Sequence, residues 1–173
     1  MEQNQIYGGS SLTRVNAIIN DPEYLNYVHD LEELEKKRVF CRHNMEHFLN
    51  VARIAMILNM EENADHEREL IYATALLHDI GRANEYRTGV RHEQESVRLA
   101  PPIIRRAGFN EDEEAVILSA IGNHRNKDCI SADAKSLDSI IYRADKLSRA
   151  CFYCDAQENC DKARKKRNHE LKI

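Results

Sequence analysis

A histidine and an aspartate, His78 and Asp79, stand at the end of a long apolar stretch of the chain. The stretch 70–77 reads Leu-Ile-Tyr-Ala-Thr-Ala-Leu-Leu, which predicts a helix that is buried on nearly every side. Burying two ionisable groups without partners would cost several kcal/mol. Two interpretations follow: the pair caps a solvated helix end, or it binds a metal cation, for which imidazole and carboxylate are both ligands.

Four further ionisable residues lie within or at the ends of other predicted helices. These residues are His47, His92, His124 and Asp145. Asp145, for example, lies four residues after Ile141, beside a face on which apolar residues recur at helical spacing. A single histidine in such a place is more often a core or surface residue than a metal ligand. The repetition of this placement along one chain favours a shared metal site.

The order of these residues resembles the signature of the HD-domain metal-dependent phosphohydrolases. The matching features are His47 before Val51-Ala52, the His78-Asp79 doublet, and the late aspartate of Ala144-Asp145-Lys146. The resemblance covers residues 40–150 and implies a compact, single-domain, all-α helical bundle. It also implies that one metal is bound by His47, His78, Asp79 and Asp145. Members with two metals carry extra histidines between the doublet and the last aspartate. The resemblance therefore implies a second site completed by His92 and His124 and bridged by Asp79.

Two branches of this family have signatures that the chain does not match. The cyclic-dinucleotide branch carries a paired histidine and a Gly-Tyr-Pro tripeptide, whereas here Arg125 follows His124 and the tripeptide does not occur. The dinucleoside-tetraphosphate branch follows its histidine with threonines and glycine, whereas this chain continues Arg125-Asn126-Lys127. The resemblance indicates a bacterial type of HD protein and leaves the substrate open.

The composition favours one helical domain with a sizeable core. Apolar residues make up 42% of the 173 residues, and six glycines and three prolines leave little room for long loops. The chain has no membrane-length apolar run, no signal-peptide pattern at residues 1–5, and an odd number of cysteines, five, which together favour a cytoplasmic protein. The net charge of −4 argues against general binding of nucleic acid or of anionic membranes. Oligomeric state cannot be predicted from these features.

Turn and cap residues divide the chain into predicted helices. Asp21, Asn110 and Ser136 are predicted N-caps, and Pro101-Pro102 is expected to interrupt the helix that starts at His92. The predicted helices are 12–19, 23–38, 43–59, 64–78, 92–107, 111–123 and 136–150.

The remaining segments are predicted to be irregular. Segments 84–90 and 126–134 are predicted loops, and residues 1–10 are expected to be flexible. The predicted organisation is an N-terminal helical extension (1–40), an HD domain (41–150) and a cysteine-containing tail (151–173).

Two divalent metals about 3.5–4 Å apart can activate water, polarise phosphoryl oxygens and stabilise the developing charge. Histidine and carboxylate ligands suit several first-row metals, and the resemblance favours iron or manganese, with one or two ions per chain. Phosphate also needs cationic partners, for which Arg82, Arg125 and Lys146 are the candidates; Asp79, Arg82 and Lys146 are the candidate catalytic residues. Each cation could instead be a surface side chain without a role. The position of Arg82, within one turn of the doublet, favours a role for it.

Three cysteines near the end of the chain, Cys151, Cys154 and Cys160, have metal-ligand spacing but need a fourth partner. Cys41 precedes His47 by six residues and Cys151 follows Asp145 by six, so two antiparallel helices would bring these cysteines together. The sequence predicts a second site on Cys41, Cys151, Cys154 and Cys160, holding zinc or an iron–sulfur cluster. The alternative is ordinary reduced thiols; Cys129 lies outside the set in either case.

The basic stretch 162–167, Lys-Ala-Arg-Lys-Lys-Arg, follows the cysteines. It is expected to be a solvated, frayed helix, or to contact nucleic acid or a polyanionic substrate.

Three functions remain open at this point. The first is a metal-dependent phosphomonoesterase or phosphodiesterase that acts on a small, nucleotide-like substrate. The second is a di-iron oxygenase, because a few relatives of this fold use two irons for O₂ chemistry. The third is a non-catalytic module in which the cysteines sense metal or redox state. The presence of every expected HD ligand argues against the third.

Overall fold

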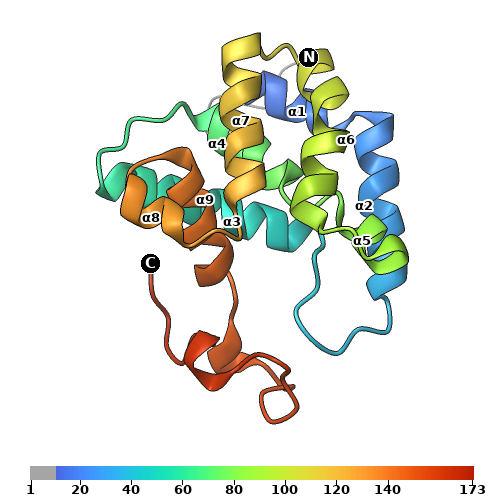
Figure 1. The fold of residues 1–173 in the computed structure, drawn as a ribbon, viewed down its shortest axis with the longest axis vertical. Helices are drawn as coiled ribbons and strands as arrows, with labels where there is room; N and C mark the ends of the chain where they lie inside the picture. Colours follow the sequence, from blue (N-terminus) through green and yellow to red (C-terminus); the bar gives the residue numbers. More distant parts are fainter. Residues whose placement is uncertain (1–10) are drawn as a thin grey trace, which may run out of the picture.

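Every regular element of the described chain is helical, as the sequence predicts. The computed structural model describes residues 11–173, and no strand occurs among them. The α-helices are α1 (Thr13–Ile19), α2 (Pro22–Glu35), α3 (Met45–Glu61), α4 (Arg68–Leu77), α5 (Arg82–Thr88), α6 (His92–Arg106), α7 (Glu111–Asn123), α8 (Asp128–Ala132) and α9 (Leu137–Leu147) (Figure 1). The prediction that residues 1–10 are flexible concerns residues outside the described range.

Helix α4 lies at the centre of the fold, where it contacts α1, α3, α6, α7 and α9. Residues 73–77 of this helix are completely buried. Leu76 packs in a hydrophobic core with residues of α1, α2, α6 and α7, whereas Ile71 packs in a second core with residues of α3 and α9. Apolar burial on both sides, worth about 25 cal/mol per Å², therefore fixes the end of α4, with the doublet His78-Asp79, inside the molecule.

Side-chain caps set the beginning of several helices. Asp21 accepts hydrogen bonds from the backbone N–H groups of Glu23 and Tyr24 at the start of α2. Asn110 and Glu113 form a capping box at α7, and Ser136 caps α9. The three predicted N-caps are confirmed.

The predicted ends of some helices are displaced. Helices α2 and α9 end three residues before the predicted ends at 38 and 150, which exceeds the one or two residues by which assigned helix ends usually vary. Helix α4 begins at Arg68 and not at residue 64, because Asn63 and Asp65 adopt positive φ angles that are incompatible with a right-handed helix.

The predictions of loops at 84–90 and 126–134 are wrong. Residues 82–88 form α5, where the side chain of Asn84 donates to Glu95 of α6 at 2.8 Å, and Gly89 ends the helix with a φ of 78°. Segment 126–134 contains the short helix α8, which packs on α9 and buries Cys129. The polar composition of both segments led to the prediction of loops. Their helices form because they pack against neighbouring helices, α5 on α6 and α8 on α9.

The prediction that Pro101-Pro102 interrupts α6 is also wrong. Each proline lacks an N–H group, so the helix loses two backbone hydrogen bonds at this point. The flanking residues Ala100, Ile103 and Ile104 are completely buried in the core. We attribute the continuity of α6 to this apolar packing, which outweighs the lost bonds.

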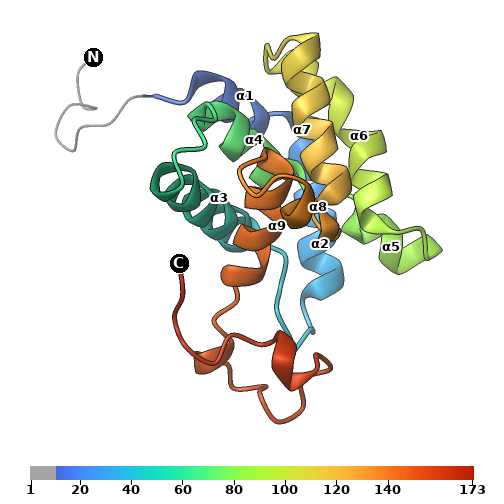
Figure 2. The same cartoon turned by 60° about the vertical axis from the view of Figure 1, so that its left-hand side comes forward.

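The two ends of the described chain differ in their relation to the core. Helices α1 and α2 contribute Val15, Ile18 and Tyr24 to the same hydrophobic core as α4 and α6. The segment after α9 forms only two 3₁₀ turns, Cys151–Tyr153 and Arg164–Lys166, and lies below the helical body (Figures 1 and 2). The basic stretch 162–167 is therefore not a frayed α-helix. The division of the chain at residues 40 and 150 stays a prediction.

No helix in residues 11–173 combines the length and the apolar character that crossing a bilayer requires.

Candidate metal centre

The doublet His78-Asp79 lies at the C-terminal end of α4 and is almost completely buried. The exposed fractions are 0% for His78 and 3% for Asp79. The Nδ1 atom of His78 lies 2.7 Å from the carbonyl oxygen of Ala75, one turn back in α4. A proton on Nδ1 makes this contact a hydrogen bond and leaves Nε2 as the free, metal-binding nitrogen of the ring.

The two carboxylate oxygens of Asp79 face two different sets of imidazoles. Oδ2 lies 3.3 Å from Nε2 of His78 and 3.9 Å from Nε2 of His47. Oδ1 lies 3.1 Å from Nε2 of His92 and 3.5 Å from Nε2 of His124. A carboxylate in this position can bridge two cations, one on each side.

The described residues contain two groups of possible metal ligands, and within each group the ligand atoms all lie within 4.8 Å of one another. These groups are His47, His78 and Asp145, and Asp79, His92 and His124. They come from helices far apart in the sequence: α3, α4 and α9 supply the first, and the turn after α4 and the ends of α6 and α7 supply the second. Asp145 Oδ1 lies 3.6 Å from His47 Nε2, so α9 contributes a carboxylate to the first group.

The second group is oriented in the same way as His78. His124 Nδ1 lies 2.6 Å from the carbonyl oxygen of Ile121, and His92 Nδ1 lies 2.6 Å from Glu85 Oε2. Their Nε2 atoms lie 3.2 Å from each other. Both Nδ1 atoms are thus held by acceptors outside the centre, and both Nε2 atoms face inward.

Several inward-facing atoms have no hydrogen-bond partner within the described chain. These are Nε2 of His47, Nε2 of His78 and Oδ1 of Asp79, all of them buried. An unsatisfied buried polar atom costs about 1–3 kcal/mol, and three of them meet here. Imidazole nitrogens and carboxylate oxygens are ligands of divalent first-row metals, so the donors present fit a pair of such ions.

The protonation states suit this use. Burial lowers the pKa of the His47 imidazole to about 4 and also lowers the pKa of His124, so both rings are neutral near neutral pH. Burial alone would raise the pKa of Asp79, but the surrounding imidazoles outweigh it and hold that pKa well below its ordinary value. His47, His124 and the Asp79 carboxylate are therefore in the forms that bind metal. Burial alone would lower the pKa of His78, but the neighbouring Asp79 carboxylate outweighs it and raises that pKa.

The comparison with known families agrees with this geometry. The family model for the HD domain matches residues 44–150 of the chain. The chain belongs to the HD domain family. A relative from Clostridium beijerinckii, described as an uncharacterized protein, is 39% identical over 160 residues, which are 92% of this chain and 99% of the relative. No solved structure matches the chain.

We call the six residues of the two ligand groups the HD site. One further histidine near it, His43, was not predicted from the sequence. Its Nε2 lies 3.8 Å from Asp79 Oδ2, and its Nδ1 lies 2.7 Å from Glu35 Oε1. His43 precedes His47 by four residues, a helical spacing, but it lies just before the N-cap of α3. That four-residue spacing is the feature of the sequence that could have indicated His43 as a neighbour of the site.

Glu35 orients this side of the HD site. Its buried carboxylate accepts hydrogen bonds from the backbone N–H of His43 and from the hydroxyl of Tyr86. Burial raises the pKa of Glu35, but His43 and Tyr86 outweigh that effect and lower the pKa to about 2. An ionised Glu35 fixes the His43 ring through Nδ1, a carboxylate–histidine arrangement common around metal sites.

The three cations predicted to bind phosphate lie around the HD site in different environments. Arg82 lies over the His92 ring, with an Nη1–Nδ1 distance of 3.2 Å. Arg125 is half exposed and approaches Glu93 at 3.7 Å. Lys146 is paired with Oδ2 of Asp145, so its ammonium group holds a proposed ligand in place. All three line one pocket together with five of the six HD-site residues, all except the fully buried His78.

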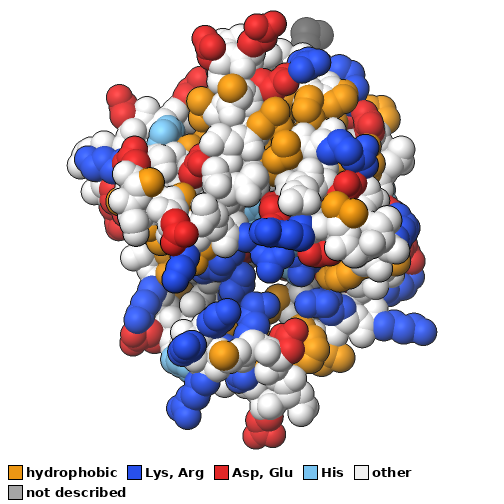
Figure 3. Space-filling model, viewed as in Figure 1, with side chains coloured by type: hydrophobic (Ala, Val, Ile, Leu, Met, Phe, Trp, Pro, Cys, Tyr) orange, Lys and Arg blue, Asp and Glu red, His pale blue; other side chains and the backbone are white. Residues whose placement is uncertain are grey.

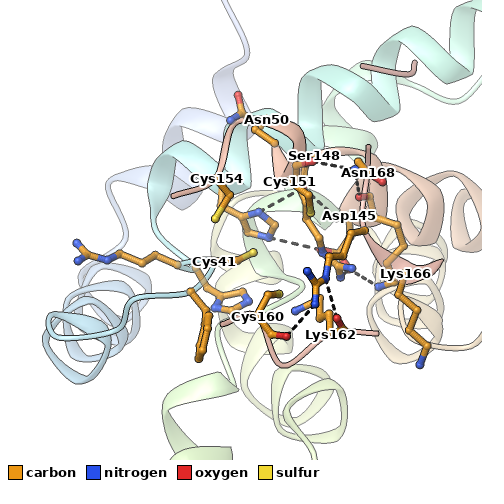
Figure 4. A pocket seen from close by; sticks show the side chains of 18 of the residues that line it. Cys41, Asn50, Asp145, Ser148, Cys151, Cys154, Cys160, Lys162, Lys166 and Asn168 are labelled. Atoms are coloured by element: carbon orange, nitrogen blue, oxygen red, sulfur yellow. Dashed lines mark hydrogen bonds and ion pairs between the residues drawn. The ribbon is translucent and has the colours of Figure 1, made fainter. Parts of the chain in front are cut away.

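The four cysteines of the predicted second site line this same pocket (Figure 4). All five cysteines belong to the described residues, and all are free thiols. The two ligand groups found among the described residues contain no cysteine. The structure therefore brings Cys41, Cys151, Cys154 and Cys160 to one cavity without placing their sulfur atoms in either group. A shared thiolate site stays a prediction.

Gly81 sets the distance between the doublet and α6. Its N–H donates to Ser96 Oγ at 2.9 Å. A Cβ atom at this position would lie 2.4 Å from the backbone nitrogen of Ser96 and 2.6 Å from the carbonyl oxygen of His92. Because both contacts are with backbone atoms, α6 would have to move away, and His92 would move with it.

We expect Gly81→Ala to weaken metal binding at the Asp79–His92–His124 group and to destabilise the fold by about 1–3 kcal/mol through overpacking. Gly122→Ala is the matched control, since its Cβ would meet Val97 at an ordinary 3.6 Å. Metal analysis and thermal unfolding of both variants make the comparison. Equal metal content and equal stability in the two variants would contradict this account of Gly81.

Proposed function

We propose that the chain is a metal-dependent phosphohydrolase acting on a small, nucleotide-like phosphate ester, either a monoester or a diester. The observation that carries the proposal is the position of Asp79, whose two oxygens face two separate sets of imidazole Nε2 atoms. Membership of the HD domain family supports the same class of reaction.

We propose that one ion binds His47, His78, Asp79 and Asp145, and that a second binds Asp79, His92 and His124. Iron or manganese is the proposed metal. When bound, two ions at these residues would supply hydroxide at neutral pH and would stabilise charge on the phosphoryl oxygens. The remaining residues bind, orient and neutralise the substrate.

Arg82 is the proposed phosphate-binding and charge-stabilising residue closest to the doublet. Its guanidinium is largely buried and lies 3.8 Å from Glu35 and 3.8 Å from Glu85, so its orientation is set by two carboxylates. Arg125, at the exposed side, binds the substrate as it enters. Lys146 acts partly through Asp145, whose Oδ2 it neutralises together with Arg149.

The proposed substrate is a small molecule that binds in the pocket lined by most of the HD site. Nucleic acid and membrane are not proposed partners. We place the protein in the cytoplasm, where five free thiols stay reduced.

We expect Asp79→Ala to lower metal-dependent phosphatase activity by about a thousandfold or more, because both ions lose a ligand. The helical content should stay close to that of the wild type. Asp128→Ala, which removes an exposed carboxylate outside the pocket, is the control. The measurement is hydrolysis of a panel of nucleotides and phosphoesters, with circular dichroism and metal analysis of each protein.

Full activity in Asp79→Ala, or in wild-type protein stripped by a chelator, would rule out the proposal. Oxygen consumption on a polyol by an iron-loaded protein without phosphatase activity would instead identify the di-iron oxygenase alternative.

The thiolate site is proposed separately from the HD site, with Cys41, Cys151, Cys154 and Cys160 as ligands. Four thiolates favour zinc or an iron–sulfur cluster. Binding would require the segment after α9 to close on the residues before α3, and would brace the HD site under redox control.

We expect Cys154→Ser to remove sulfur-bound zinc or iron and to make the segment 150–173 more sensitive to proteolysis. Cys129→Ser should do neither, because Cys129 is buried beside α9 and does not line the pocket. Metal analysis and limited proteolysis provide the two readouts. If Cys154→Ser matches Cys129→Ser in both, the cysteines act as ordinary thiols.

A further inference from the structure

The HD site opens into a large cavity whose outer wall is the segment after α9. The cavity has a volume of about 1330 Å³, larger than the roughly 300–1,000 Å³ of most small-ligand sites. Its lining includes residues of the C-terminal segment from Cys151 to Asn168. A single phosphate group at the metal centre would fill only a small part of this space.

Basic residues outnumber acidic residues in the lining of this cavity, whereas acidic residues outnumber basic ones in the whole chain. The whole chain has 25 Lys and Arg against 29 Asp and Glu. Among the described residues that line the cavity, nine are Lys or Arg and four are Asp or Glu. Two of those four acids, Asp79 and Asp145, belong to the HD site. Figure 3 shows basic side chains on both sides of the hollow between the helical body and the C-terminal segment.

The cations on the two sides of the cavity differ in their partners. Arg82, Arg125, Lys146 and Arg149, on the helical body, each have a carboxylate oxygen within 4 Å. Arg42, before α3, donates instead to the backbone carbonyl oxygens of Lys36 and Arg38. Lys162, Lys165 and Lys166, on the C-terminal segment, form no ion pair with any carboxylate of residues 11–173. Three ammonium groups therefore line the cavity without an anionic partner from the described chain.

The C-terminal segment is held in place by hydrogen bonds to backbone carbonyls. Asn168 Nδ2 donates to the carbonyl oxygens of Lys146, near the end of α9, and of Arg149, two residues beyond it, both at 2.8 Å. Arg167 donates to the carbonyl oxygens of Gln157, Cys160 and Lys162, which closes the loop between them. Lys162 and Lys166 (Figure 4), together with Lys165, thus belong to a segment that Asn168 attaches to the end of α9, the helix that supplies Asp145.

We propose that residues 151–168 form a cationic lid that binds phosphate groups beyond the one at the HD site, so that the substrate carries several phosphates. We call these residues the lid. The proposal rests on the proposed function, since it assigns one phosphate to the metal centre. It selects small polyphosphorylated compounds over simple phosphomonoesters, because only the former can reach Lys162, Lys165 and Lys166 while one phosphate occupies the HD site.

The test compares two inorganic probes, orthophosphate and tripolyphosphate, on the full-length, metal-containing protein. The lid variant is Lys162→Gln/Lys165→Gln/Lys166→Gln. The matched control is Lys37→Gln/Lys135→Gln/Lys172→Gln, which removes the same charge at positions outside both the cavity and the lid. Dissociation constants are measured at fixed salt, and metal is added back wherever tripolyphosphate removes it.

We expect the wild type to bind tripolyphosphate at least about tenfold more tightly than orthophosphate, and the lid variant to lose about tenfold in tripolyphosphate affinity. Its affinity for orthophosphate should change by less than about twofold. The control variant should keep the preference of the wild type.

Three results would overturn the proposal: no preference in the wild type, equal losses for both anions in the lid variant, or an equal loss of preference in the control. Tighter binding of a single-stranded oligonucleotide than of tripolyphosphate would assign the lid to nucleic acid instead. These anion affinities are measured independently of hydrolysis. Absence of metal-dependent activity would refute the proposed function, but the affinities of the lid and control variants would still test the lid.

Discussion

The carboxylate of Asp79 is buried at the end of α4, with imidazole nitrogens facing each of its two oxygens. Without a cation, this arrangement leaves Asp79 Oδ1 and two histidine nitrogens buried and unpaired among the described residues, and it brings two Nε2 atoms to 3.2 Å. Metal binding would relieve these costs together, because imidazole nitrogens and carboxylate oxygens are both ligands of divalent metals. Helices α3, α6, α7 and α9 each bring a candidate ligand to the end of one buried helix, α4.

The surroundings of the centre are organised to keep the ligands in one orientation. Backbone carbonyls and Glu85 hold the Nδ1 atoms of His78, His124 and His92, so that Nε2 faces inward in all three. Lys146 holds the outer oxygen of Asp145 in a comparable way. Gly81 allows the close approach of α6 that these contacts need. Orientation therefore depends on residues that never touch a metal, and substitutions at these positions should act on the site indirectly.

The sequence was sufficient to predict the family, the all-α fold and the six residues that converge on the centre. Those residues stand out because ionisable groups in apolar helices need a reason to be buried. The helix α5 and the continuity of α6 through Pro101-Pro102 were missed, because both depend on packing between helices and not on local preference. His43 was missed because it lies outside a helix and is positioned by Glu35, a contact that periodicity cannot indicate. The spacing of the cysteines predicted a shared location but could not give the distances between their sulfur atoms.

Anomalous diffraction from crystals of the metal-loaded protein tests the central claim most directly. The account predicts two anomalous peaks about 3.5–4 Å apart, one on each side of the Asp79 carboxylate. The first peak should be bound by His47, His78 and Asp145, and the second by His92 and His124. A single peak at saturating metal, or peaks that do not contact Asp79, would contradict a centre bridged by this carboxylate.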